Sequence, residues 1–140
     1  MKKIFFSLFV VLLFAGCQKT QSVPDVATGA TISGLISLSP ELSKKQQPSD
    51  VLYIIARKDV GPPLAVKRIE NPKFPVAYIL TAENTMFPGT PFQGEVKVSA
   101  RLDRDGNAGP AQPGDIEGIS LKNPARVGDR DVDIVIDKEW

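Results

Sequence analysis

The chain has 140 residues, of which 42% are hydrophobic and 24% are charged, and its formal net charge is +1. That length suits one domain with a real core, and no basic stripe points to nucleic acid. The sequence holds no histidine and one cysteine, which excludes Ser-His-Asp and Cys-His catalysis, histidine-ligated metals and haem, and an internal disulfide. Only Ser-Lys or carboxylate chemistry survives this filter and nothing marks such a set, so we expect no enzyme, no cofactor and no metal site.

The first residues predict an export signal. Lys2 and Lys3 precede an apolar run, Ile4–Phe14, that is too short for a transmembrane helix of about 20 residues but suits a signal-peptide core. The run ends in Ala15-Gly16-Cys17, which resembles a bacterial lipobox, so we expect a signal peptide over 1–16 and a membrane lipid on Cys17. The alternative is an ordinary secretory signal beside a buried cysteine. Gln18 favours the outer over the inner membrane, with the domain facing the periplasm.

Removal of that leader leaves 124 residues, 140 less 16, with a net charge of −1, because the leader holds two of the 17 basic residues. Residues 17–29 are polar and aperiodic, which predicts a flexible tether. Residues 30–140 predict one domain of short strands separated by Pro and Gly turns, with one helical turn within Glu41–Asp50. The expected strands are Thr31–Leu38, Val51–Arg57, Leu64–Glu70, Phe74–Thr81, Gly94–Asp103, Ile116–Leu121 and Arg130–Asp137.

The clearest strand is Gly94–Asp103, in which every second residue is apolar. Its expected inward residues are Val96, Val98, Ala100 and Leu102, and its expected outward residues are Glu95, Lys97, Ser99 and Arg101. The near-continuous apolar run of Val51–Arg57 indicates a central strand covered on both faces. Seven strands at regular spacing predict an all-β, immunoglobulin-like antiparallel β-sandwich.

Two proline-shaped loops are candidate binding sites. Gly61-Pro62-Pro63 with Lys67 and Arg68 has the residues to contact a carboxylate or haem propionates, although a rigid turn followed by solvated charges is the favoured interpretation. Lys67 and Arg68 should point to opposite faces of their strand. Gln112-Pro113-Gly114-Asp115 has a well-specified backbone path, which presents donors to a partner or merely forms a corner between sheets.

Two acidic patterns have simpler interpretations. Asp103, Asp105 and Asn107 alternate like calcium ligands, but Gly106 comes too early for an EF-hand, so a hairpin turn is favoured. The carboxylates of Asp131, Asp133 and Asp137 should line the solvated face of the last strand, where they discourage edge pairing.

Several segments in order resemble one protein family. They are Ser37–Leu42, Val51–Arg57, Gly61–Arg68, Met86–Gly89, Ala111–Gly118 and Val132–Asp137. Together they are similar to the C-terminal immunoglobulin-like periplasmic domain of cytochrome c-type biogenesis protein H (the CycH-like proteins), here as a stand-alone lipoprotein. The resemblance spans roughly residues 31–137.

The resemblance implies a non-catalytic binding or assembly role in cytochrome c maturation, with apocytochrome c or a protein of the haem-ligation complex as partner. In that family membrane helices and tetratricopeptide repeats precede the domain; here the lipid anchor is expected to replace the helices. The expected contacts are Pro62, Pro63, Lys67, Arg68, Gln112, Pro113, Gly114 and Asp115. A structural envelope lipoprotein that shares only the fold is the alternative.

Overall fold

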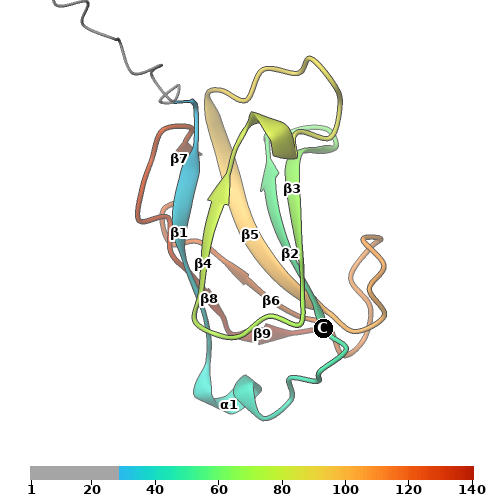
Figure 1. The fold of residues 1–140 in the computed structure, drawn as a ribbon. Helices are drawn as coiled ribbons and strands as arrows, with labels where there is room; N and C mark the ends of the chain where they lie inside the picture. Colours follow the sequence, from blue (N-terminus) through green and yellow to red (C-terminus); the bar gives the residue numbers. More distant parts are fainter. Residues whose placement is uncertain (1–28) are drawn as a thin grey trace, which may run out of the picture.

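The computed structural model describes residues 29–140, so the predicted signal peptide, Cys17 and nearly all of the predicted tether lie outside the described residues. Two β-sheets face each other (Figure 1). The smaller sheet has the order β4-β1-β8 and the larger one β3-β2-β5-β6-β9, with the short β7 paired to β5. No helix within residues 29–140 is long and apolar enough to cross a membrane.

The smaller sheet contains β1 (Ile32–Leu38), β4 (Val76–Leu80) and β8 (Ile134–Ile136). The larger sheet contains β2 (Val51–Arg57), β3 (Pro63–Glu70), β5 (Glu95–Asp103), β6 (Ile116–Ile119), β7 (Ala125–Arg126) and β9 (Lys138–Glu139). One helical turn, α1 (Pro40–Ser43), follows β1, and the 3-10 turn η1 (Ala82–Asn84) follows β4. The predicted β-sandwich is confirmed, and β7 and β9 are additional strands of two residues each that the sequence pattern did not reveal.

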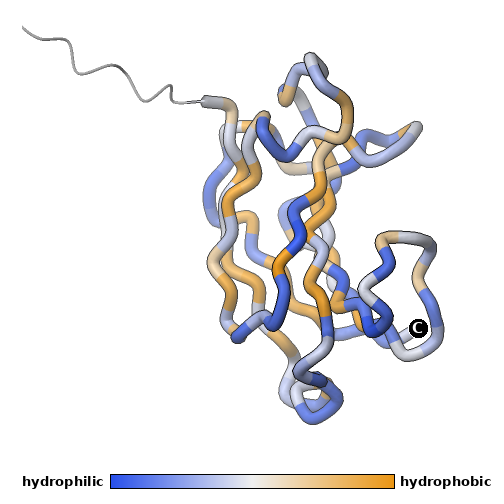
Figure 2. The backbone as a smooth tube through the Cα atoms, turned by 45° about the vertical axis from the view of Figure 1, so that its right-hand side comes forward, coloured by the Kyte–Doolittle hydropathy of each residue, from blue (hydrophilic) through white to orange (hydrophobic). Residues whose placement is uncertain are grey.

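The predicted inward faces form the core between the sheets. Val96, Val98, Ala100 and Leu102 of β5 are all buried, and β2 is a central strand between β3 and β5, as expected. Figure 2 shows the apolar colour concentrated along the strands and the polar colour gathered in the loops. Phe92 is a core residue that lies outside any strand, so the alternation of apolar and polar residues along the strands does not predict its burial.

Two details of the predicted sheets need correction. β1 pairs with β4 in antiparallel fashion, as predicted, but it pairs with β8 in parallel fashion. In the parallel pair, Ile36 lies opposite Ile134 and Leu38 opposite Ile136. Arg101, expected on a solvated face, is only 8% exposed. The reason is that the 104–115 loop folds back over this face, where Gly109 O accepts from Arg101 Nη2 at 2.8 Å and Gly106 O accepts from Tyr53 Oη at 2.7 Å.

The loops divide between two opposite ends of the sandwich (Figure 1). At the Gly29 end, Gly128 N donates to Thr31 O at 2.7 Å and Val127 N donates to Gly94 O at 2.9 Å. At the α1 end, Arg104 Nη2 donates to Lys45 O at 3.1 Å, and Gly114 N donates to Trp140 O at 3.0 Å. The register of the larger sheet separates these ends, because Arg57 pairs with Lys97 at the first and Val51 with Asp103 at the second.

Candidate functional site

The two predicted binding loops lie at opposite ends of the sandwich. Pro62 and Pro63 close the β2–β3 turn at the Gly29 end, where Gly61 has a positive φ of 100° that favours glycine. Gln112–Asp115 lies at the α1 end, bonded to the C-terminal residue Trp140. The structure therefore does not bring these two loops together into one surface.

The Gln112–Asp115 loop uses its backbone donors internally. Gln112 N donates to Asp115 Oδ2 at 2.8 Å, Asp115 N to Gln112 O at 3.0 Å, and Gly114 N to Trp140 O at 3.0 Å. Asp115 is only 1% exposed, and its Oδ1 also accepts from Arg104 N at 3.2 Å. The predicted corner between two sheets is wrong, because the loop joins β5 and β6, which are neighbours in the larger sheet. The assignment of Gln112, Pro113, Gly114 and Asp115 as partner contacts stays a prediction.

Lys67 and Arg68 contact different parts of the molecule. Lys67 Nζ donates to Ile79 O of β4 at 3.1 Å and so connects the edges of the two sheets. Arg68 forms an ion pair with Glu70, and its Nε donates to Tyr53 Oη at 3.3 Å on the outer face of the larger sheet. These partners confirm that the two cations point to opposite faces, so one flat ligand contacts at most one of them.

The two acidic patterns serve the backbone. Asp103 Oδ1 and Asp105 Oδ1 both accept from Asn107 N, at 3.2 and 2.8 Å, which holds the turn at Gly106. The Asn107 bond and the Asp103 side chain lower the pKa of Asp105, whereas burial raises the pKa of Asp103. Asp131, Asp133 and Asp137 are exposed as predicted, but they flank the short β8 (Ile134–Ile136) and do not lie on a strand face. Asp133 Oδ1 accepts from Leu35 N at 2.7 Å. Within residues 29–140, no group of three acidic or sulfur ligands is placed to hold a metal ion.

A hollow in two adjoining parts lies at the α1 end, beneath the α1–β2 loop. One part has a volume of about 340 Å³, and a neighbouring part of about 530 Å³ shares Ser43, Gln46 and Phe74 with it. We call the two together the Phe74 trough. Its walls are Leu35, Ser37, Leu38, Ser43, Gln46, Gln47, Pro48, Asn71, Pro72, Lys73, Phe74 and Pro75.

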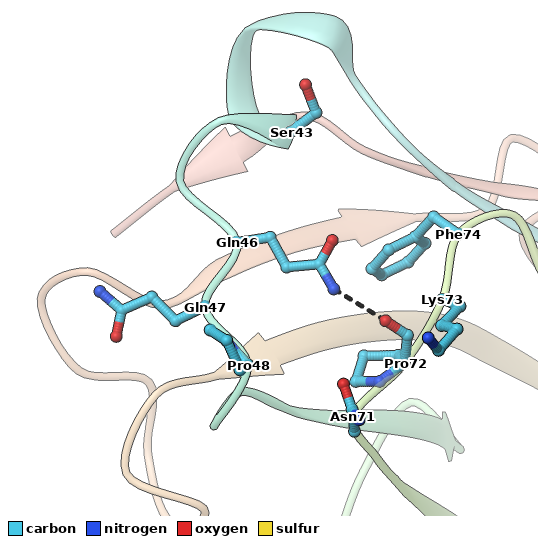
Figure 3. Close-up of a pocket in the computed structure, with 8 residues that line it drawn as sticks. All are labelled: Ser43, Gln46, Gln47, Pro48, Asn71, Pro72, Lys73 and Phe74. Carbon is cyan, nitrogen blue, oxygen red and sulfur yellow. Dashed lines mark hydrogen bonds between the residues drawn. The ribbon is translucent and has the colours of Figure 1, made fainter.

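Local sequence explains how the trough is held open. Asn71 adopts a left-handed φ of 48° at the β3–β4 turn, which Asn tolerates better than most residues. Gln46 Nε2 donates to Pro72 O at 2.7 Å and thereby fastens the α1–β2 loop to that turn (Figure 3). The Phe74 ring lies beside the Gln46 amide, while the Gln47 side chain points away from both (Figure 3).

The trough combines apolar walls with a few fixed polar groups. Prolines and a phenyl ring supply apolar walls. Gln46 keeps its Oε1 acceptor and one Nε2 hydrogen, whereas Ser43 Oγ donates to Pro40 O at 2.7 Å and has only acceptor capacity left. Grooves with aromatic walls and a few fixed polar groups bind extended peptides in other proteins. Lys73 adds one exposed cation.

Reasoning from the sequence missed the trough. Its two walls lie far apart in the chain, as Gln46-Gln47-Pro48 and Asn71-Pro72-Lys73-Phe74-Pro75, and each by itself looks like an ordinary turn. Only the pairing of β1 with β4 brings Phe74 under α1. The shared richness in proline is the one sequence signal that links them.

Comparisons with known proteins cover the whole described domain. The family model for the cytochrome c-type biogenesis protein H Ig-like domain matches residues 32–137. An uncharacterised protein of Aquifex aeolicus (strain VF5) is 30% identical over 149 residues, which covers 99% of this chain and 95% of the relative. No solved structure matches.

Proposed function

Because this chain belongs to the family of Ig-like domains of cytochrome c-type biogenesis protein H, we propose that it is a non-catalytic binding domain in cytochrome c maturation. The observation that carries the proposal is the family match over 32–137, which extends from β1 to the end of β8. The chain contains no histidine, and Met86, half exposed at 50%, would be a weak axial ligand on its own. These residues fit a domain that binds another protein better than one that ligates haem iron.

The partner we propose is an extended segment of apocytochrome c, bound in the Phe74 trough. An unfolded chain presents free backbone groups and apolar side chains together, and the trough offers amide groups beside proline and phenyl walls. The ring of Phe74 packs partly against the core, so its position is fixed before any ligand arrives. Preformed walls lower the entropy cost of binding.

Capture from detergent-solubilised membranes tests the proposal. The tagged protein should recover apocytochrome c, and a strain that lacks the gene should lose c-type haem staining. Gln46→Arg places a bulky cation in the trough and should abolish capture. Ser49→Arg places the same cation on the same loop, at an exposed residue outside the trough walls, and should leave capture unchanged.

The outcomes are distinguishable. Equal capture by both variants would exclude the trough as the contact. Capture of haem-ligation proteins without apocytochrome c would replace the proposed partner. Normal levels of c-type cytochromes in the deletion strain, with neither partner recovered, would refute the role in cytochrome c maturation. The alternative, a structural envelope lipoprotein, would then stand. Equal melting temperatures for the two variants are required, since neither Gln46 nor Ser49 lies in the hydrophobic core.

We also propose that a lipid on Cys17 anchors the domain to the outer membrane, facing the periplasm. The support is the lipobox-like Ala15-Gly16-Cys17 after an apolar run of signal-peptide length, with Gln18 after the cysteine. Cys17→Ser should release the protein from the membrane fraction, and mass spectrometry should find acyl groups on the wild type alone. A serine variant that stays membrane-bound, together with a wild type of unmodified mass, would refute the anchor.

A further inference from the structure

Two neighbouring loops at the Gly29 end expose apolar side chains. Val60 is 90% exposed, Phe87 56% and Met86 50%. The loops that carry them line one shallow cavity of about 130 Å³, whose walls include Lys58, Val60, Pro62, Pro63, Leu64 and Phe87. Met86 N donates to Leu64 O at 3.0 Å, which fixes the second loop to β3. We call Val60, Met86 and Phe87 the apolar tip.

The apolar tip lies at the end where the described chain begins. Gly29 leads directly into β1, and both tip loops project from the same end of the sandwich (Figures 1 and 2). Eleven residues lie between Cys17 and Gly29. Even fully extended, such a segment spans only about 40 Å, so a lipid on Cys17 would keep this end close to the bilayer.

We propose that the apolar tip inserts into the surface of the phospholipid bilayer that carries the anchor. The inference rests on the proposed anchor, and it adds which end of the domain touches lipid. A valine exposed at 90% contributes nothing to the core, whereas valine, methionine and phenylalanine all gain by entering the headgroup and acyl boundary. Lys58 flanks the tip, and its long side chain has the reach to place its charge among lipid phosphates while its stem stays apolar.

The single tryptophan supplies an internal control. Trp140 is 52% exposed and lies at the opposite, α1 end, where its carbonyl accepts from Gly114 N at 3.0 Å. In the full mature lipoprotein, reconstituted into phosphatidylethanolamine and phosphatidylglycerol vesicles, Trp140 should emit as an exposed indole. Lipids brominated in their acyl chains should not quench it.

The test moves the indole to the tip. In a Phe87→Trp, Trp140→Phe variant, brominated lipids should quench the emission and the spectrum should shift to the blue, because the indole enters the boundary of the acyl chains. Val60→Trp with Trp140→Phe provides a second reporter on the other loop, at a side chain that is 90% exposed. Circular dichroism equal to that of the wild type confirms that each variant folds.

Each outcome decides the matter. Quenching at positions 60 and 87 without quenching of Trp140 supports insertion by the tip. If the protein floats with the vesicles but neither indole is quenched, the proposed insertion of the apolar tip is wrong and the proposed anchor stands. Quenching of Trp140 as well would mean that no particular end is inserted, which also overturns the proposal. A chain without acyl mass that neither floats nor changes its emission overturns the anchor and the tip together.

Discussion

A methyl group at position 118 should damage this fold more than its size suggests. Gly118 of β6 lies directly beneath β8, and a Cβ added there would be 2.0 Å from Val135 O and 2.8 Å from Ile136 Cα. Real Cβ contacts below 3.0 Å essentially do not occur, so the β8 backbone would have to retreat by at least 1.0 Å. Backbone atoms cannot rotate aside as a side chain can.

The cost follows from what β8 contributes. A retreat of that size breaks the hydrogen bond from Asp137 N to Glu117 O, now 3.1 Å, and lifts Ile134 and Ile136 from the core, where they are 1% and 0% exposed. Overpacking costs about 1–3 kcal/mol, a lost hydrogen bond about 1, and partial exposure of two isoleucines about 1–2, which gives about 3–6 kcal/mol. That is a large share of the roughly 5–15 kcal/mol by which a domain is stable.

Urea unfolding of residues 29–140, followed by circular dichroism, measures the loss. Gly118→Ala should lower the midpoint strongly or prevent folding. Gly109→Ala is the matched control, because its Cβ would meet only Asn107 side-chain atoms at 3.8–3.9 Å, and it should stay within about 1 kcal/mol of the wild type. A Gly118→Ala protein as stable as the control would refute the close packing of β8 on β6.

Three further results should follow from the same structure. The fragment 29–140 should fold without the anchor and melt cooperatively with a β-type circular dichroism spectrum; a helical spectrum would contradict the sandwich. Val98→Asp, at a side chain with 0% exposure, should cost about 4 kcal/mol or more by burying an unpaired charge, whereas Lys97→Asp on the exposed side of β5 should change the urea midpoint little. Asp105→Asn should destabilise the protein at neutral pH but not in acid, because a carboxyl whose pKa is lowered in the folded state stabilises above its unfolded pKa and ceases to do so as pH falls through the folded value. A stability difference that does not shrink as the pH falls from 7 into the acid range would contradict that role.

The sandwich could be predicted from the sequence because its strands obey one strong rule. Period-2 burial places Val96 and Val98 inside without any knowledge of their partners, and Val51–Arg57 is apolar enough to require cover on both faces. Burial on the outer face of β5 follows no such rule. Arg101 is covered by a loop whose path depends on Asp103, Asp105 and Asp115, and that dependence appears only once the turn has formed.

The trough and the β8 contacts lie beyond local patterns for a similar reason. Gly34 and Gly118 seem to be weak points in strands, but a Cβ at Gly34 would lie 2.3 Å from Val132 O, so both glycines make room for the same returning segment. Gly34 and Val132 are roughly a hundred positions apart in the chain. A single sequence shows the glycines but not what approaches them.

The separation of the two ends limits what one partner can contact. β5 has nine residues, so at about 3.3 Å per residue the loops at its ends are about 30 Å apart. A compact ligand in the Phe74 trough therefore cannot reach Pro62 and Pro63, and a partner that contacts both must be an extended chain or a large protein.

The same distance makes the two ends energetically independent, because the free-energy effects of substitutions more than about 10 Å apart with no shared contacts are additive. With the apolar tip in the bilayer surface, the trough would lie at the end of the domain that is turned away from the bilayer. Gln46→Arg should then leave the lipid contact intact, and the indole at the tip should leave capture intact, so the two proposals stand or fall separately.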